Sequence, residues 1–314
     1  MSKSTRQAFG ESLARLGETH PHIVALDADL AKSTKSEIFA KKFPERFFEM
    51  GIAEANMIGT AAGLSFTGKL PFLCSFGCFI TGRYDTIRLS AAYSQANIRI
   101  VGTHAGVGIG DDGHSQMGLE DLSLMRCLPT LGVFQPMDAY ETELIMDYLV
   151  NTWQGPAYLR LTRQNLPDLF PRQEKFQPGK LMQIRGSNTG KNSVTCIATG
   201  ASVAEAVEAS QLLEASGISL SVWNAHSLKP FDDQKTRELS QNCRLLLTVE
   251  DHTVIGGLGT CVAEALAQQT QHSRLVKLGI QDLFGESGEP AELYEKFGIS
   301  AKAIAARVKK ELAG

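Results

Sequence analysis

The sequence has no apolar run that approaches the roughly 20 residues a membrane-spanning helix needs. It also has no excess of one charge: 31 basic and 34 acidic residues give a net charge of −3. This balance provides no general attraction to nucleic acid or to an anionic membrane surface. The first ten residues, MSKSTRQAFG, lack the apolar stretch of a secretory signal. We therefore expect a cytoplasmic protein.

Cysteine is scarce and poorly placed for metal binding. Of the six cysteines, only Cys74 and Cys78 are close neighbours, and no CxxC pair or Cys/His cluster has the spacing of a zinc site. We expect buried thiols without a chemical role, and no metal ligands in this chain.

The composition and the apolar pattern predict a two-domain α/β protein. At roughly 100–200 residues per domain, 314 residues suggest two domains, and 43% hydrophobic with 21% charged residues argues against disorder. Short apolar runs alternate along the chain with segments of helical periodicity. Such alternation is typical of βαβ units, so we predict two consecutive domains, each a mostly parallel sheet covered by helices.

The alternation is interrupted once. Between Pro167 and Asn192 it lapses into a stretch that begins PDLFPRQEKFQPGK, which is typical of a linker. We therefore predict a first domain over residues 1–168, a linker over 169–192 and a second domain over 193–314. The strands expected in the first domain are Ile23–Leu26, Arg46–Met50, Leu70–Phe76, Ile98–Gly102, Gly132–Gln135 and Ala157–Leu161.

The glycine-rich segment THAGVGIGDDGHSQMGLEDL carries the densest set of polar candidates. Its glycines match GxGxxG, but Asp111 and Asp112 lie inside the match and would repel a pyrophosphate. His104, Asp112 and Gln116 together donate and accept hydrogen bonds, which favours a hydroxyl-rich ligand. A solvated surface loop is the alternative.

Glu54 opens the segment EANMIGTAAGLS, and two readings of it are open. A carboxylate in the first helical turn is stabilised by the helix dipole, by roughly 0.3–1 kcal/mol. However, Glu54 follows Gly51, Ile52 and Ala53, which offer few polar groups to solvate it. A carboxyl in such surroundings can share a proton with a ring nitrogen, so we predict an acid–base role.

Two arginines and two phenylalanines complete the candidates. Arg163 follows a predicted strand, and its guanidinium has the geometry to bind two phosphate oxygens. Arg6 lies in the first turn of a predicted helix, where its positive charge opposes the helix dipole. Phe76 and Phe79, three residues apart, would ordinarily belong to a core.

Together these segments resemble the carboxy-terminal half of the transketolase family. The resemblance covers essentially the whole chain and is carried by GIAEANM, SFGCF followed by DTIRLSA, the GDDG-containing loop, MRCLPTLGVFQPMDAYE, LRLTRQNLP, VWNAHSLKPFD and VEDHTVIGGLG. It implies a pyrimidine-binding domain for thiamine diphosphate followed by a transketolase C-terminal domain. The cofactor would serve as electron sink for a two-carbon ketol unit.

The resemblance also implies a role for each candidate. Glu54 matches the catalytic glutamate that hydrogen-bonds the aminopyrimidine ring, and Phe76 and Phe79 match residues around that ring. Asp29 matches an aspartate that contacts the cofactor. Tyr84 is expected to fill the place of a further aromatic, where this chain has Gly82. The substrate-binding matches are Arg6, Ser33 and Arg163 for the sugar phosphate and His104, Asp112 and Gln116 for its hydroxyls.

The GDG motif and downstream Asn that hold the diphosphate and Mg²⁺ in this family are absent. The resemblance therefore implies one subunit of a split transketolase, active only in a heterotetramer with an amino-terminal subunit that holds the metal. Three alternatives remain: a 2-oxo-acid dehydrogenase beta subunit, a subunit like deoxyxylulose-phosphate synthase, and a noncatalytic structural subunit.

Overall fold

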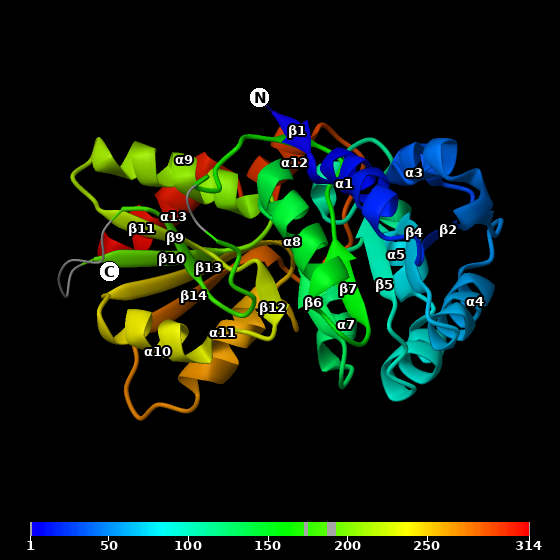
Figure 1. The fold of residues 1–314 in the computed structure, drawn as a ribbon. Coiled ribbons are helices and arrows are strands. Elements are labelled where there is room, and N and C mark those ends of the chain that lie inside the picture. Colours follow the sequence, from blue (N-terminus) through cyan, green and yellow to red (C-terminus); the bar gives the residue numbers. More distant parts are fainter. Residues whose placement is uncertain (1, 173–174, 187–192, 314) are drawn as a thin grey trace.

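The chain folds into two α/β halves that lie side by side (Figure 1). The computed structural model describes residues 2–172, 175–186 and 193–313. Each half has its own sheet with helices packed against it, and this confirms the predicted fold class. Within these ranges, no helix is long and apolar enough to cross a membrane.

The sheet of the first half has seven strands in the order β12-β6-β7-β5-β4-β2-β3. All neighbouring strands are parallel except β12, which runs antiparallel to β6. The strands are β2 (Ile23–Asp27), β3 (Phe47–Glu49), β4 (Leu70–Phe76), β5 (Arg99–Thr103), β6 (Gly132–Phe134), β7 (Ala157–Arg160) and β12 (Ser227–Lys229). The sequence predicted all of these strands except β12.

Alternating side chains of β2 explain why helices cover both faces of this sheet. Ile23 and Ala25 belong to one apolar cluster, whereas Val24 and Leu26 belong to another on the opposite face. The first face is covered by α1 (Thr5–Thr19), α3 (Glu37–Lys42) and α8 (Ala139–Asn151), and the second by α4 (Glu54–Phe66), the π-helical η2 (Ile87–Tyr93) and α7 (Asp121–Cys127).

The segment between β4 and β5 does not form one continuous helix, although its apolar spacing over Ile80–Tyr93 is helical. The segment is divided into α5 (Gly77–Thr81), α6 (Tyr84–Thr86) and η2. The division falls at Gly82 and Arg83, since glycine is a poor helix former. The remaining short helices of this half are α2 (Ala31–Thr34), η1 (Pro44–Arg46), η3 (Val107–Ile109) and η4 (His114–Gln116).

The second half repeats the same plan with five strands, in the order β14-β13-β10-β11-β9. The strands are β9 (Met182–Arg185), β10 (Val194–Ala198), β11 (Leu220–Asn224), β13 (Leu245–Thr253) and β14 (Arg274–Ile280). In Figure 1, α9 and α13 lie above this sheet and α10 and α11 below it. The helices are α9 (Ser202–Glu214), α10 (Asp233–Gln241), α11 (Leu258–Leu266), α12 (Pro290–Lys296) and α13 (Ala301–Ala313).

Two strands show that the boundary between the halves in space differs from the boundary in the sequence. The segment expected to be a linker contains β9, which pairs antiparallel with β11, although residues 173–174 and 187–192 of that segment lie outside the described ranges. The strand β12 belongs to the second half by sequence but extends the sheet of the first, with Ser227 opposite Phe134 and Lys229 opposite Val133. The Lys229 ammonium also donates to the carbonyl of Leu128.

Candidate functional site

The candidate site lies at the edge of the first sheet where β2, β4, β5 and β7 end. These neighbouring strands are parallel, so their carboxyl ends meet at one edge, which is where open α/β sheets bind ligands. The segments that leave this edge, residues 28–36, 77–79, 104–118 and 161–164, carry most of the predicted site residues.

A small antiparallel ribbon brings Arg6 to this edge. The strand β1 (Lys3–Ser4) pairs with β8 (Asn165–Leu166), which directly follows the Arg163 segment. The Ser4 hydroxyl then accepts from the Gln7 amide and caps α1, so Arg6 lies in the first turn of that helix. The ribbon thus places Arg6 beside Arg163, although 157 positions separate the two in the sequence.

Arg6 links two of the predicted residues directly. Its Nη1 donates to the Ser33 carbonyl oxygen at 2.8 Å and lies 3.0 Å from Nε2 of His104. A guanidinium can only donate, so Nε2 is the acceptor and the proton is on Nδ1, which donates to the Thr103 hydroxyl at 2.8 Å. His104 is therefore fixed in one tautomer.

The surroundings of His104 keep its imidazole neutral. Burial, followed by the positive charges of Arg6 and Arg163, lowers the pKa of His104 to about 3. Its backbone has a φ of 59°, in the left-handed region that non-glycine residues rarely adopt. A residue held in this conformation by its neighbours is typical of a functional site.

Arg6 and Arg163 face one cavity of about 370 Å³. The Arg163 Nη1 donates to the Ile109 carbonyl at 2.6 Å and lies 3.9 Å from the Asp112 carboxylate. Burial and Arg163 both lower the pKa of Arg6. Asp111 and Glu289 also line this cavity, whereas Asp112 contacts it only through Arg163. The two guanidinium groups suit a phosphate, and the carboxylates suit hydroxyl groups of the same ligand.

Gln116 and His114 lie on η4, at the far end of the same loop. Gln116 is half-buried. The His114 ring instead lies 6.1 Å from the ring of Phe284 and lines a second cavity of about 620 Å³, which Phe79 also lines. His114 therefore contacts the second half of the chain rather than Arg6 and Arg163.

Phe76 and Phe79 form a stack that includes His104. Their ring centroids are 5.5 Å apart with nearly parallel planes, and the Phe76 ring stacks on His104 at 3.9 Å. Tyr84 contacts a different residue: its hydroxyl lies 3.2 Å from the Cys127 sulfur, and this hydrogen bond raises the pKa of Tyr84. No described contact joins Tyr84 to the two phenylalanines.

Glu54 begins α4 and is buried, with 4% of its surface exposed. Among the described residues, its carboxylate makes no hydrogen bond, and its oxygens are not among the fully buried unpartnered atoms, so they keep contact with solvent and are accessible to a ligand. The segment before it is held by Glu49, whose Oε1 accepts from the amides of Asp29 at 2.8 Å and Gly51 at 3.1 Å. Glu49 thereby ties the predicted cofactor residue Asp29 to the entry of α4.

Sequence reasoning gave Glu49 and Asp27 no role in the site. The Asp27 carboxylate accepts from the Leu30 amide and from the hydroxyls of Thr34 and Ser36, and it thus holds the loop that carries Ser33. Burial raises the pKa of Asp27 to about 6 despite these bonds. Each of the two carboxylates is the last residue of its strand. This position made Asp27 one of the polar strand-end residues to consider in the sequence, whereas Glu49 lay inside the predicted strand Arg46–Met50.

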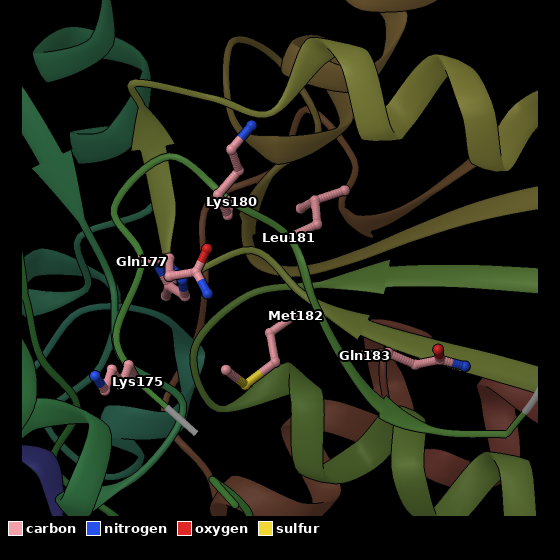
Figure 2. A pocket seen from close by; sticks show the side chains of 7 residues that line it. Lys175, Gln177, Lys180, Leu181, Met182 and Gln183 are labelled. Atoms are coloured by element: carbon pink, nitrogen blue, oxygen red, sulfur yellow. The ribbon is translucent and has the colours of Figure 1, made fainter. Parts of the chain in front are cut away.

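A further cavity of about 260 Å³ lies at the crossing between the halves, lined by the residues of Figure 2 and by His226. None of the predicted site residues lines it. Figure 2 shows Lys175 and Gln183 on opposite sides and the Lys180 and Leu181 side chains pointing away from Met182. The polar groups do not converge, so the cavity lacks the geometry of a binding site.

Comparison with known proteins agrees with this arrangement. Residues 1–168 match the family described as the transketolase pyrimidine binding domain, and residues 187–304 match the transketolase C-terminal domain. A transketolase C-terminal section from Methanocaldococcus jannaschii is 40% identical over 99% of this chain and 96% of its own length. Human transketolase is 38% identical over 98% of this chain, which spans only 48% of the human protein.

A solved structure of similar fold is described as a split-gene transketolase, an inactive β4 tetramer. It superimposes with a TM-score of 0.88, is 45% identical, and the match covers 99% of this chain and 98% of that one. The sheet-edge site, the two matched domains and the relatives of equal length lead to one conclusion. The chain belongs to the transketolase family, and it corresponds to the carboxy-terminal part of the family's longer members.

Proposed function

We propose that this chain is the carboxy-terminal subunit of a two-chain transketolase that transfers a two-carbon ketol unit from a ketose phosphate to an aldose phosphate. The observation that carries the proposal is the placement of Glu54: it begins α4, is 4% exposed as a residue, and its carboxylate makes no hydrogen bond among the described residues. A ligand atom can therefore bond to this carboxylate without breaking a hydrogen bond within the chain.

The residues around Glu54 fit thiamine diphosphate. An open carboxylate suits a nitrogen of the aminopyrimidine ring, and the stacked Phe76 and Phe79 offer flat surfaces to an aromatic ring. Asp29, held through its amide by Glu49, is proposed as a further contact, and Tyr84 as a residue at the edge of the ring. When bound, the cofactor would supply the carbanion-stabilising chemistry, and Glu54 would exchange a proton with it.

Substrate binding is proposed for the residues around His104. Arg6, Arg163 and the Ser33 segment would take the phosphate, since both guanidinium groups face the 370 Å³ cavity. His104, Asp112 and Gln116 would orient the hydroxyls. The neutral His104 offers a lone pair at Nε2 to a hydroxyl donor whenever Arg6 turns to the phosphate.

The diphosphate and Mg²⁺ are assigned to an amino-terminal partner subunit. No cluster of three or more His, Cys, Asp or Glu side chains suited to a metal occurs in the part of the chain that the structure describes. Large apolar side chains are exposed on the same half as Glu54, with Ile52 at 83% and Tyr93 at 85%. Apolar exposure of this kind is typical of an interface. We therefore propose a heterotetramer. The similar β4 tetramer is described as inactive, which agrees with the need for a second kind of subunit.

Two further proposals concern the organisation of the chain and its location. The pyrimidine-binding domain is assigned to residues 1–168 and the C-terminal domain to 193–314, joined by 169–192. A cytoplasmic location is proposed because all six cysteines are unpaired, as expected in a reducing compartment.

The test is reconstitution with the amino-terminal subunit, Mg²⁺ and thiamine diphosphate, followed by assay of ketol transfer. Glu54→Gln keeps the size of the side chain but removes its acid–base function, and we expect turnover to fall by about 10²–10⁴-fold. Glu45→Gln, an exposed change on η1, is the matched control. Undiminished turnover of Glu54→Gln, with the complex intact by size-exclusion chromatography, would remove Glu54 from the mechanism.

The same complex separates the alternatives. Pyruvate as the preferred donor would favour a 2-oxo-acid dehydrogenase or a deoxyxylulose-phosphate synthase-like subunit over a transketolase. Cofactor binding that is equal with and without Glu54, together with no turnover of any donor, would favour a noncatalytic subunit.

A further inference from the structure

Two adjacent carboxylates near the end of β13 make the same kind of bond to different halves of the chain. Glu250 accepts from the amides of Leu258 and Gly259, each at 2.7 Å, and so holds the first turn of α11 in its own half. Asp251 accepts from the amides of Val107 at 2.7 Å and Gly108 at 3.2 Å, which belong to the first half. The strand β13 thus holds α11 of its own half through Glu250 and the glycine-rich loop of the first half through Asp251.

The Asp251 carboxylate is held in place from the other side. The Tyr294 hydroxyl of α12 donates to its Oδ2 at 2.9 Å, and the Gln164 amide donates in turn to the Tyr294 oxygen at 2.8 Å. The Asp251 carbonyl accepts from Arg160 at 3.0 Å. Asp251, Arg160 and Tyr294 are all buried.

The backbone of the loop is shaped to receive this carboxylate. Gly106 has a φ of +88°, and a Cβ at this position would lie 2.1 Å from the Asp251 Oδ2. A Cβ on Gly108 would lie 2.2 Å from the Gln164 amide nitrogen. Only glycine, which has no side chain, allows the backbone to approach Asp251 and Gln164 this closely.

The loop needs such an anchor because it is rich in glycine. Gly106, Gly108, Gly110 and Gly113 lose more conformational entropy on ordering than other residues do. At its other end, η3 is held by Arg163, which donates to the Ile109 carbonyl. The carboxylate of Asp251 and the guanidinium of Arg163 therefore clamp the turn that lies between His104 and Asp112.

We propose that Asp251 is a positioning residue of the C-terminal domain: by holding the amides of Val107 and Gly108, it sets the loop that presents His104, Asp112 and Gln116 to the sugar. The identity of the ligand in this proposal rests on the proposed function, whereas the anchoring of the loop by Asp251 does not depend on it. It gives the second domain a direct part in substrate binding.

The test compares Asp251→Asn with Glu250→Gln. The new amide of Asp251→Asn must turn its NH₂ group toward one of the donors, so it loses at least one hydrogen bond to the loop. Glu250→Gln makes the same chemical change on the same strand but acts on α11. In the isolated full chain, we expect hydrogen exchange at Val107 and Gly108 to quicken by about tenfold in Asp251→Asn only.

In the reconstituted complex, Asp251→Asn should raise the KM for sugar phosphate by about tenfold, with a smaller change in kcat and unchanged thiamine diphosphate binding. Glu250→Gln should leave this KM as in the wild type. Unchanged exchange at the two amides, or an equal rise of KM in both variants, would overturn the proposal. If Asp251→Asn fails to fold, Tyr294→Phe, which removes one donor to the same carboxylate, must shift exchange and KM in the same direction.

If the wild-type complex transfers no ketol unit, the proposed function fails. The exchange rates of the isolated chain still decide whether Asp251 holds the loop, so the two failures are distinct.

Discussion

Replacing Glu141 with glutamine should remove a steep pH dependence from the stability of this protein. Glu141 lies on α8 at the junction of the two halves and is fully buried. One carboxylate oxygen accepts from the Met137 amide at 2.7 Å and the other from the Asn224 amide at 2.8 Å. Burial outweighs these bonds and raises the pKa of Glu141 to about 8, and the Asp138 charge adds to the effect.

The sign of this pH dependence follows from the number of protons bound to the folded and unfolded states. Between an unfolded-state pKa near 4.5 and the folded-state value of about 8, the folded protein holds one more proton than the unfolded chain. The free energy of unfolding should therefore fall as pH rises through this window and level off above it. Three pH units, from 5 to 8, at roughly 1.4 kcal/mol per unit give a loss of about 4 kcal/mol.

Glu141→Gln keeps the shape and cannot ionise. The Asn224 Oδ1 atom is buried and has no partner, so a turn of that amide would offer an acceptor to the new NH₂ group. We expect the variant to gain stability relative to the wild type as pH rises from 5 to 8. The measurement is denaturant unfolding followed by the fluorescence of Trp153 and Trp223, one in each half.

The half-buried Glu143, whose side chain is 40% exposed, provides the control, because Glu143→Gln changes the same helix without altering a fully buried group. Its unfolding free energy should follow the pH profile of the wild type. Parallel profiles for the wild type and Glu141→Gln between pH 5 and 8 would refute the reasoning that burial keeps this carboxyl protonated.

Two further variants test single contacts. Gly106→Ala and Gly113→Ala both place a side chain at positive φ with extended ψ, a region that is essentially restricted to glycine, but only at Gly106 would the new carbon collide with the buried Asp251 carboxylate. Thermal unfolding should therefore show a clearly larger loss for Gly106→Ala, and equal losses would contradict the clamp. Arg160→Met leaves the fully buried Asp121 carboxylate without its 2.8 Å ion pair and should cost about 3–5 kcal/mol of unfolding free energy. Adding Asp121→Leu should recover part of that loss in the same assay, and no recovery would show that the charge is not its cause.

The strands that pack in the interior of each sheet could be predicted from the sequence. The predicted strand Leu70–Phe76 has the same bounds as β4, and all seven of its residues are buried. A buried parallel strand appears as a short apolar run between turns, so the signal is local. The strands β9 and β12 escaped prediction because they are short edge strands that carry polar residues.

The candidate site could be predicted residue by residue but not as a set of contacts. His104 and Arg6 were singled out separately, yet their bond joins positions 98 residues apart and depends on the β1–β8 ribbon. The bond from Val107 to Asp251 spans 144 residues and leaves no local pattern in either segment. Tyr84 was expected near the phenylalanines on the resemblance, and its described hydrogen bond is to Cys127 instead. Its place at the cofactor stays a prediction.

The antiparallel pairing of β12 with β6 determines where this protein can be divided. Cutting the chain after residue 186 would strip β12 from the first sheet and leave the β6 edge with open amide and carbonyl groups, a template for aggregation. The two family domains are therefore not two separable pieces. Any attempt to express the pyrimidine-binding portion alone has to carry residues 227–229 with it or supply a substitute strand.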